Sequence, residues 1–421
     1  MIFELNRVAI SDIIIVGDNM KKAFYIIIIV FLLNGCLPIN KNNEMIDLSN
    51  MNIEEIKEYA TLNNLKLDIE TTYHDSILKD KVINQSIESG TVIKENDSLK
   101  VVISLGKTPI TLYKEYKVNE LGNVPIMMYH GIIDKKNVDT SYTGGNVDRD
   151  GYNRTSEAFR NDLEMYYQKG YRMIRLIDYM NGNIDTELGK SPIVLTFDDG
   201  NVNNFKVNGL DDEGNLIIDP NCAVGILEEY KKKYKDFNVT ATFFLNSGLF
   251  GQSKYNNQIL KWLVENGYDI GNHTKNHVDF SNVDEVRTQA EIAYMYKTLD
   301  EIIPDKYIKV IALPFGSPYK SDHPNFSYIL KGSSEGYNYE TEGTLRVGWT
   351  YDYSPFHKSF NKTFVKRIRA YDNDGVEHDI QMTFDNLEKS RYISDGDKNT
   401  IVVLDEANIN VNIKDKKIIK Y

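Results

Sequence analysis

The strongest constraint on the fold is an alternation that begins at Val124, where short apolar runs are followed in turn by amphipathic segments. The apolar runs have the length of buried strands, and the segments between them have the spacing of helices that cover a sheet. The predicted strands are residues 124–129, 193–197, 240–245, 268–271 and 308–313. Such βα units build a parallel sheet, so the predicted fold class is α/β.

Local signals place the ends of two helices and one insertion. Ser156 is a candidate N-cap for a helix that ends at Gly170, and Gly267 is a candidate terminator for a helix over residues 259–264. The segment 201–222 is rich in Asp, Asn and Gly, which is typical of an inserted surface loop.

Several chemically active residues follow the predicted strands directly. They are His130, Asp198, Asp199, His273 and Pro314. A parallel barrel gathers the carboxyl ends of its strands on one face, so these residues are expected to converge there.

The residue types at these strand ends predict a metal site that supports hydrolysis. His273 and His277 are spaced i, i+4 and offer two imidazole ligands, while Asp198 and Asp199 offer one carboxylate for the metal and one for a proton. Each motif alone has a plainer interpretation, since Asp-Asp-Gly is common in turns and His-x-x-x-His is common on surfaces. The prediction therefore depends on their combination.

The N-terminal residues 1–36 predict export and anchoring. Lys21 and Lys22 precede an apolar run over 23–33, which is the pattern of a signal peptide and is short for a membrane span. Gly35-Cys36 follows at once and resembles the lipobox of bacterial lipoproteins, which implies lipidation at Cys36 and anchoring to the membrane. An uncleaved N-terminal anchor is the alternative, and both place the rest of the chain outside the cytoplasm.

Charge and cysteine content exclude other classes. The net charge of −12 and the pI near 5.2 argue against binding of nucleic acid, which relies on clustered Lys and Arg. The two cysteines, Cys36 and Cys222, provide neither a disulfide framework nor a cysteine-based zinc site.

Residues 45–106 predict a small α+β unit with a helix over 54–62 and short strands near 82–85 and 99–104. The sequence of residues 81–90 and 98–106 resembles that of a PASTA module, which implies association with the cell wall. A spacer without a ligand is the alternative. Residues 107–123 are interpreted as a linker to the domain over 124–421.

The larger domain resembles the polysaccharide deacetylases of the NodB-homology type, carbohydrate esterase family four. Residues 196–199, 273–277 and 314–316 match its first three motifs, and 242–245 and 267–273 match the framework between them. The resemblance implies a distorted (β/α) barrel that removes N-acetyl groups from peptidoglycan or a poly-N-acetylglucosamine polymer.

The resemblance also implies roles for individual residues. Asp199, His273 and His277 would bind a divalent metal ion, usually zinc, and Asp198 would be the general base. The residues assigned to the substrate groove are His130, Thr274, Pro314, Phe315 and Gly316. Two of them have plainer alternatives, because His130 is also interpretable as a core histidine bonded to backbone and Thr274 as a capping hydroxyl.

Two departures from the family pattern support a rival hypothesis. Ala312 stands where much of the family has an arginine that orients the base, and no Leu-x-His motif supplies a general acid. Loss of an acid costs on the order of 10²- to 10⁴-fold in rate. The rival is a non-catalytic wall-binding lipoprotein with a degenerate barrel, and a weaker third option keeps the metal site but hydrolyses another amide or imide.

Overall fold

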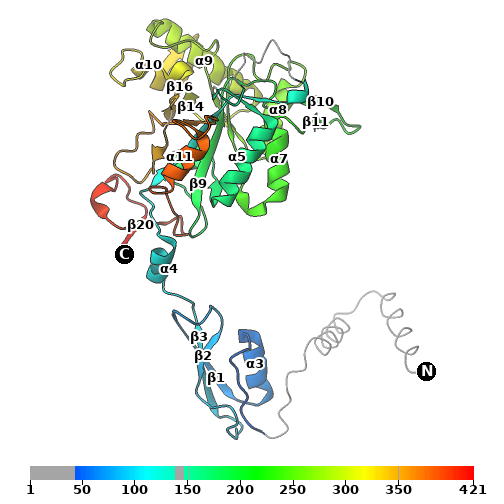
Figure 1. The fold of residues 1–421 in the computed structure, drawn as a ribbon, viewed down its shortest axis with the longest axis vertical. Coiled ribbons are helices and arrows are strands. Elements are labelled where there is room, and N and C mark those ends of the chain that lie inside the picture. The colour runs from blue at the N-terminus through cyan, green and yellow to red at the C-terminus, as the bar shows by residue number, and fades with distance from the viewer. Residues whose placement is uncertain (1–42, 138–146, 150, 349) are drawn as a thin grey trace, which may run out of the picture. The chain divides into compact units, whose positions relative to one another are not determined.

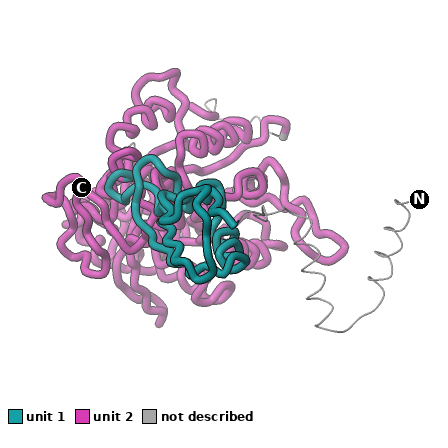
Figure 2. Tube along the Cα trace, turned by 90° about the horizontal axis from the view of Figure 1, so that it is seen from below, with its two compact units in different colours: residues 1–112 teal, residues 113–421 magenta. Residues whose placement is uncertain are grey.

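The computed structural model describes residues 43–421, apart from 138–146, 150 and 349. The predicted signal and Cys36 lie outside the described residues. Within them, no helix has both the length and the apolar character needed to cross a membrane. The chain divides into two compact units, Met1–Leu112 and Tyr113–Tyr421 (Figure 2).

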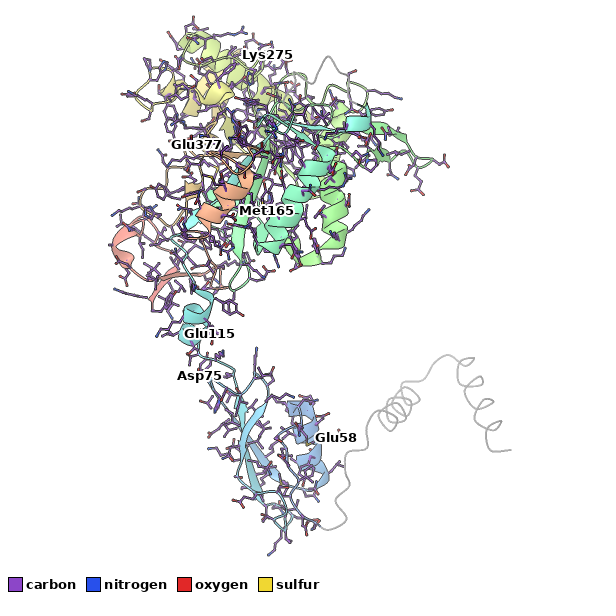
Figure 3. All side chains as sticks on the ribbon, viewed as in Figure 1. Glu58, Asp75, Glu115, Met165, Lys275 and Glu377 are labelled. Carbon is purple, nitrogen blue, oxygen red and sulfur yellow. The ribbon has the colours of Figure 1, made fainter. Side chains whose placement is uncertain are left out.

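The first unit packs one helix against a small sheet. Its elements are α3 (Ile53–Leu62), β1 (Lys66–Thr72), β2 (Val82–Gln85) and β3 (Ser98–Ser104). The sheet has the order β1-β3-β2, with β1 and β3 parallel and β2 and β3 antiparallel. Asn52 and Glu55 form a capping box at the start of α3. Ile56 faces the core, whereas Glu58 lies on the exposed face of the helix (Figure 3).

The predicted linker over 107–123 has structure of its own. It contains α4 (Pro109–Tyr116), and Val118 and Glu120 beyond this helix are buried within the second unit. The chain therefore joins the core of the larger unit before the first strand of its main sheet.

The second unit is built on a parallel sheet of eight strands with the path β17-β14-β13-β12-β9-β5-β19, in which β8 also pairs with β9. The strands are β5 (Ile126–Tyr129), β8 (Tyr171–Met173), β9 (Ser191–Phe197), β12 (Thr242–Leu245), β13 (Asp269–Asn272), β14 (Val310–Ala312), β17 (Gly343–Leu345) and β19 (Ile368–Arg369). All pairings in this sheet are parallel. The predicted α/β class is confirmed.

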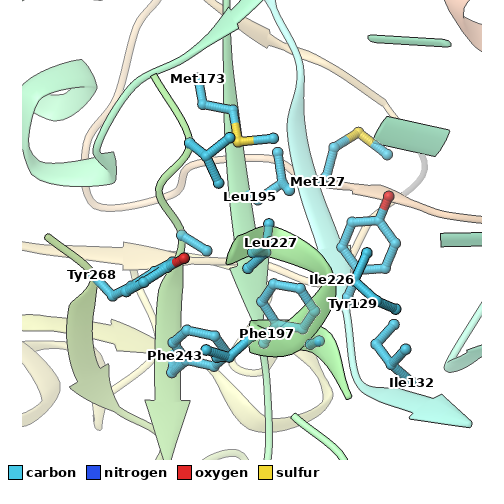
Figure 4. Close-up of a cluster of buried hydrophobic side chains, with 14 of the residues drawn as sticks. Met127, Tyr129, Ile132, Met173, Leu195, Phe197, Ile226, Leu227, Phe243 and Tyr268 are labelled. Atoms are coloured by element: carbon cyan, nitrogen blue, oxygen red, sulfur yellow. The ribbon is translucent and has the colours of Figure 1, made fainter. Parts of the chain in front are cut away.

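Helices cover the sheet (Figure 1). They are α5 (Ser156–Gln168), α6 (Leu176–Met180), α7 (Ala223–Lys233), α8 (Asn256–Glu265), α9 (Glu285–Ile302), α10 (Phe326–Leu330) and α11 (Ile380–Leu387). The N-cap of α5 is Thr155 and not the predicted Ser156, because the Thr155 side chain accepts the amide hydrogen of Ala158. Between helices and sheet, Phe197 stacks on Tyr129 and on Phe243 in the core (Figure 4).

The sheet bends toward a barrel, and the segment 365–369 brings its two edges together. Val365 forms a parallel bridge with Leu345 at one edge, while Ile368 pairs with Met127 at the other. The predicted distorted barrel is confirmed in this form. Arg367 lies between the two pairings and is fully buried.

The predicted surface loop over 201–222 is more ordered than expected. It contains an antiparallel hairpin of β10 (Val207–Leu210) and β11 (Leu216–Ile218), and Phe205 before it is fully buried. The segment is an inserted surface segment as predicted, but it holds a hairpin, and Phe205 packs its ring against Trp262 of α8.

Shorter strands complete the unit outside the main sheet. They are β4 (Asn123–Val124) with β18 (Asp352–Tyr353), β6 (Gly131–Ile133) with β7 (Asn153–Thr155), β15 (Lys331–Ser334) with β16 (Tyr337–Glu340), and β20 (Thr400–Val403) with β21 (Lys417–Lys420).

Candidate active site

Strand β9 delivers Asp198 and Asp199 to the carboxyl edge of the sheet. Every residue of β9 is buried, and the amide of Asp198 extends the ladder by donating to the carbonyl of Tyr129 at 2.9 Å. The chain then turns sharply, with φ of +73° at Asp199 and +63° at Gly200. A Cβ at residue 200 would lie 2.1 Å from the carbonyl oxygen of Leu249, so glycine is required for this turn.

His273 follows β13 in the same way and faces the two carboxylates. Its Nδ1 lies 2.7 Å from the carbonyl oxygen of Ala312. Since a carbonyl only accepts, Nδ1 carries the hydrogen and the Nε2 lone pair is free to bind a metal. This Nε2 lies 3.2 Å from Oδ1 of Asp199.

His277 reaches the same carboxylate through a tight loop. Its Nε2 lies 3.6 Å from Oδ1 of Asp199. The loop has left-handed φ values of +67° at Thr274 and +53° at His277. Glu291 of α9 holds the loop, because its buried carboxylate accepts the backbone and side-chain amides of Asn276 at 2.7 and 2.8 Å.

These three side chains fit a divalent metal ion. One ligand atom from each of Asp199, His273 and His277 lies within 4.8 Å of the others. The His273 Nε2 is buried without a hydrogen-bond partner in the described part of the chain, which is what a ligand nitrogen facing an ion would show. Two imidazoles and one carboxylate are a donor set that suits zinc and leaves a position open.

Asp198 lies beside this set and is paired with Arg367. The guanidinium donates from Nη1 and Nη2 to the two carboxylate oxygens at 2.7 Å each, and both side chains are almost wholly buried. Burial favours the neutral acid, but the charge of Arg367, together with His273, outweighs it and holds the pKa of Asp198 well below its ordinary value. Asp198 is therefore ionised.

Sequence reasoning missed Arg367, which lies 169 residues after Asp198 in the chain. It occupies the segment that joins the sheet edges, and its Nε donates to the carbonyl of Arg346 at 2.8 Å. Ala312, at the position where the family arginine was expected, contributes only its carbonyl to His273. In the sequence, Arg367 is marked only by the short segment Val365–Arg369, in which apolar and basic residues are mixed. This segment does not show which residue across the barrel Arg367 would pair with.

A cavity of 340 Å³ opens over these residues. It is lined by His130, Tyr152, Asn153, Asp198, Asp199, Asn201, His273, His277, Leu313, Phe315 and Val347. His130 is half-buried, and its buried Nδ1 has no hydrogen-bond partner among the described residues, contrary to the alternative of a core histidine bonded to backbone. Burial lowers the pKa of His130, although the charges of Asp198 and Asp199 oppose this.

Three residues assigned to the groove do not line this cavity. Thr274 is fully buried, and its hydroxyl makes no hydrogen bond within the described chain, so the predicted capping role is also wrong. Pro314 starts a short turn, η3 (Pro314–Gly316), and is buried. Gly316 has φ of +68°, and a Cβ there would lie 2.8 Å from the amide of Val347. Pro314 and Gly316 flank Phe315 in this turn, and the Phe315 side chain is 54% exposed at the rim of the cavity.

The histidines that could not be aligned with a Leu-x-His motif lie elsewhere. His323, His357 and His378 are not among the residues that line the cavity. The imidazoles that face it come from His130, His273 and His277.

Comparison with known proteins found two matching family models and several similar solved structures. Residues 185–326 match the family model for polysaccharide deacetylase, and residues 43–105 match that for the PASTA domain. Similar solved structures include a deacetylase of Streptococcus pyogenes in complex with acetate, with 18% identity and a TM-score of 0.45 over 62% of this chain and 98% of that one. A de-N-acetylase of Aggregatibacter actinomycetemcomitans has 14% identity and a TM-score of 0.40 over 63% and 99%.

A third similar structure is a family 4 carbohydrate esterase of Bacillus anthracis, with 18% identity and a TM-score of 0.25 over 55% of this chain and 86% of that one. The two matches to family models cover separate stretches, one in each compact unit. Residues 185–326 thus match a polysaccharide deacetylase domain, and residues 43–105, earlier in the chain, match a PASTA domain.

Proposed function

We propose that the protein is a metal-dependent hydrolase that removes N-acetyl groups from an amino-sugar polymer outside the cytoplasm, either peptidoglycan or poly-N-acetylglucosamine. The observation that carries the proposal is the paired Asp198 and Arg367 beside three converging metal ligands in one open cavity.

Asp199, His273 and His277 would hold the metal, with zinc the expected ion. When bound, a divalent ion there supplies a Lewis acid for the acetamide carbonyl and lowers the pKa of a bound water from 15.7 to about 7. The hydrogen bond from His273 Nδ1 to the carbonyl of Ala312 fixes the ring that presents Nε2 to the ion.

Asp198 is the proposed proton acceptor for the attacking water. Its low pKa makes it a weak base, but it also ensures that the carboxylate is charged at neutral pH. The bidentate contact from Arg367 fixes the carboxylate plane, so that Asp198 presents its remaining lone pairs in one orientation. Arg367 is a positioning residue in this scheme.

His130 is the proposed donor of a proton to the departing amine. It lines the cavity together with Asp198, so its ring lies where a substrate would meet it. Its ring also packs on that of Tyr152 in a T-shaped arrangement, with 5.0 Å between the ring centres. This assignment fills the role for which no Leu-x-His motif was found.

The PASTA domain supports a substrate in the cell wall, and Cys36 is the proposed point of lipid attachment to the membrane. Nucleic acid is not a proposed partner, since the acidic chain has a net charge of −12.

Release of acetate from chitooligosaccharides and from isolated peptidoglycan strands tests the proposal. We expect release that stops with a chelator, returns with zinc, and falls by about 10²- to 10⁴-fold in Asp198→Asn. Activity that survives both treatments would refute it.

The rival hypothesis of a non-catalytic wall-binding protein rested on the missing arginine and histidine. Arg367 and His130 occupy the places from which those two roles can be filled, which favours catalysis. The rival predicts wall binding by the isolated segment 45–106 and no stoichiometric metal in residues 124–421.

A further inference from the structure

We propose that Arg346 recognises an acidic group on the sugar next to the one whose N-acetyl group enters the cavity. The inference rests on the proposed function and names its substrate class: an amino-sugar polymer whose neighbouring residue carries a carboxylate or a phosphate.

Arg346 lies at the carboxyl end of β17, on the catalytic edge of the sheet. Leu345 ends the strand, and Val347 lines the cavity. The Arg346 backbone is fixed from both sides, since its amide donates to the carbonyl of Val365 and its carbonyl accepts from Arg367. Its position is therefore determined by the segment that also holds the catalytic carboxylate.

The side chain of Arg346 lies among aromatic rings and not among carboxylates. The guanidinium carbon lies 5.3 Å from the centre of the Tyr319 ring and 5.5 Å from that of Phe364. Its Nε is buried without a hydrogen-bond partner, and none of the ion pairs found in the described residues includes Arg346. Arg346 is half-buried, and a guanidinium that pairs with no carboxylate among the described residues can bind an anionic ligand.

The aromatic residues connect Arg346 to the cavity. Phe315 lines the cavity and is 54% exposed, and the hydroxyl of Tyr319 donates to its carbonyl at 3.2 Å. Tyr319 is itself 60% exposed. A polymer that leaves the cavity past Phe315 would meet the Tyr319 ring and then the guanidinium beside it.

This order of groups suits an acidic glycan. Exposed aromatic rings pack on the apolar faces of pyranose rings, and a guanidinium binds carboxylate or phosphate through two parallel hydrogen bonds. The lactyl carboxylate of muramic acid is one source of such a charge, and a phosphate ester on the sugar is another. Neutral poly-N-acetylglucosamine offers neither.

The experiment compares acetate release by the full-length protein from three glycan strands. One alternates N-acetylglucosamine with N-acetylmuramic acid, the second is its methyl amide, and the third is the methyl amide with a 6-phosphate on the muramic sugar. We expect the wild-type kcat/KM to be roughly 5- to 30-fold higher for the acidic strand than for its methyl amide, which is the gain that one charge-assisted hydrogen bond gives. The difference should lie mainly in KM. A preference for the carboxylate strand alone identifies the carboxylate as the ligand, and a preference for the phosphate strand alone identifies the phosphate.

Arg346→Gln should reduce this preference to near one, and Arg346→Lys should keep part of it. Arg160→Gln is the matched control, because it removes the same charge from α5, where Arg160 is paired with Glu229. Rising salt should weaken the wild-type preference, which tests the inference even if Arg346→Gln fails to fold.

Equal rates on acidic and neutral strands, or a preference that Arg346→Gln leaves intact, would overturn the inference while leaving the proposed function standing. Absence of acetate release from every strand would overturn the proposed function instead.

Discussion

At the scale of single residues, the pairing of Asp198 with Arg367 makes each side chain dependent on the other. Both are almost completely buried, so removing either leaves the other charge without a partner. For Arg367→Gln we expect a loss of about 3–5 kcal/mol in the free energy of unfolding. We also expect kcat to fall at least tenfold, because the carboxylate is no longer held in one orientation. Urea denaturation and acetate release measure the two effects.

The pH profile separates positioning from a merely structural role of Arg367. Without the guanidinium, burial is the largest influence on Asp198 and raises its pKa, so the acid limb of the kcat profile should move to higher pH. Arg367→Lys keeps the positive charge, so its acid limb should lie between those of the wild type and Arg367→Gln. An unchanged acid limb in Arg367→Gln would show that Arg367 acts through stability alone.

The three predicted metal ligands differ in how firmly they are held, and His273 is the most constrained. It is 1% exposed and its Nδ1 is bonded to Ala312. We expect one zinc per chain in the purified protein and its loss in His273→Gln. Zinc should also stabilise the wild type by about 2.7 kcal/mol at 100 times its dissociation constant. Metal analysis and thermal unfolding check both, and His357→Gln, away from the cavity, is the control.

At the scale of elements, α9 holds the loop that carries His277. Glu291 accepts two hydrogen bonds from Asn276, and Arg287 is paired with the same carboxylate at 2.5 Å. In Glu291→Gln the new side-chain amide would face the donors of Asn276 and Arg287, so the loop should loosen. Zinc affinity should then fall by about 10- to 100-fold, the usual cost of losing a residue that orients a metal ligand. Competition with a chromogenic chelator measures this. Glu301→Gln, exposed on the same helix, should leave affinity unchanged.

The elements that sequence could predict are those whose signal is local. Strand β9 is apolar throughout, and the carboxylates after it follow directly from the strand end. Strand β1 was missed because most of its residues are exposed, so no apolar run marks it. Arg367 was missed for a different reason: its partner is chosen by the pairing of a short segment with both sheet edges, and no local pattern encodes that pairing.

At the scale of the whole molecule, the larger unit begins earlier than the sequence pattern suggested. Buried Val118 and Glu120 precede the first apolar run, and the Glu120 carboxylate joins the chain entry to the C-terminal segment. It accepts the hydroxyl of Tyr392 and the amide of Val402, each at 2.7 Å. A fragment that starts at residue 124 would lose these contacts and should be less stable than one that starts at residue 113.

The same carboxyl group should make the stability of the larger unit depend on pH. Burial, followed by the charge of Asp395, raises the pKa of Glu120 from 4.5 to about 8 in the folded chain. Between these values the folded state retains a proton that the unfolded state has released. The free energy of unfolding should therefore fall as pH rises through this window, by about 1.4 kcal/mol per pH unit from this group.

Glu120→Gln removes the titration while keeping an acceptor for the amide of Val402. Urea denaturation at several pH values between about 5 and 8 should show a flatter dependence for this variant than for the wild type. Glu406→Gln, on the exposed η4 (Glu406–Asn408), should follow the wild type. Parallel curves for the wild type and Glu120→Gln would mean that Glu120 is already ionised in the folded chain, held by the three donors around it.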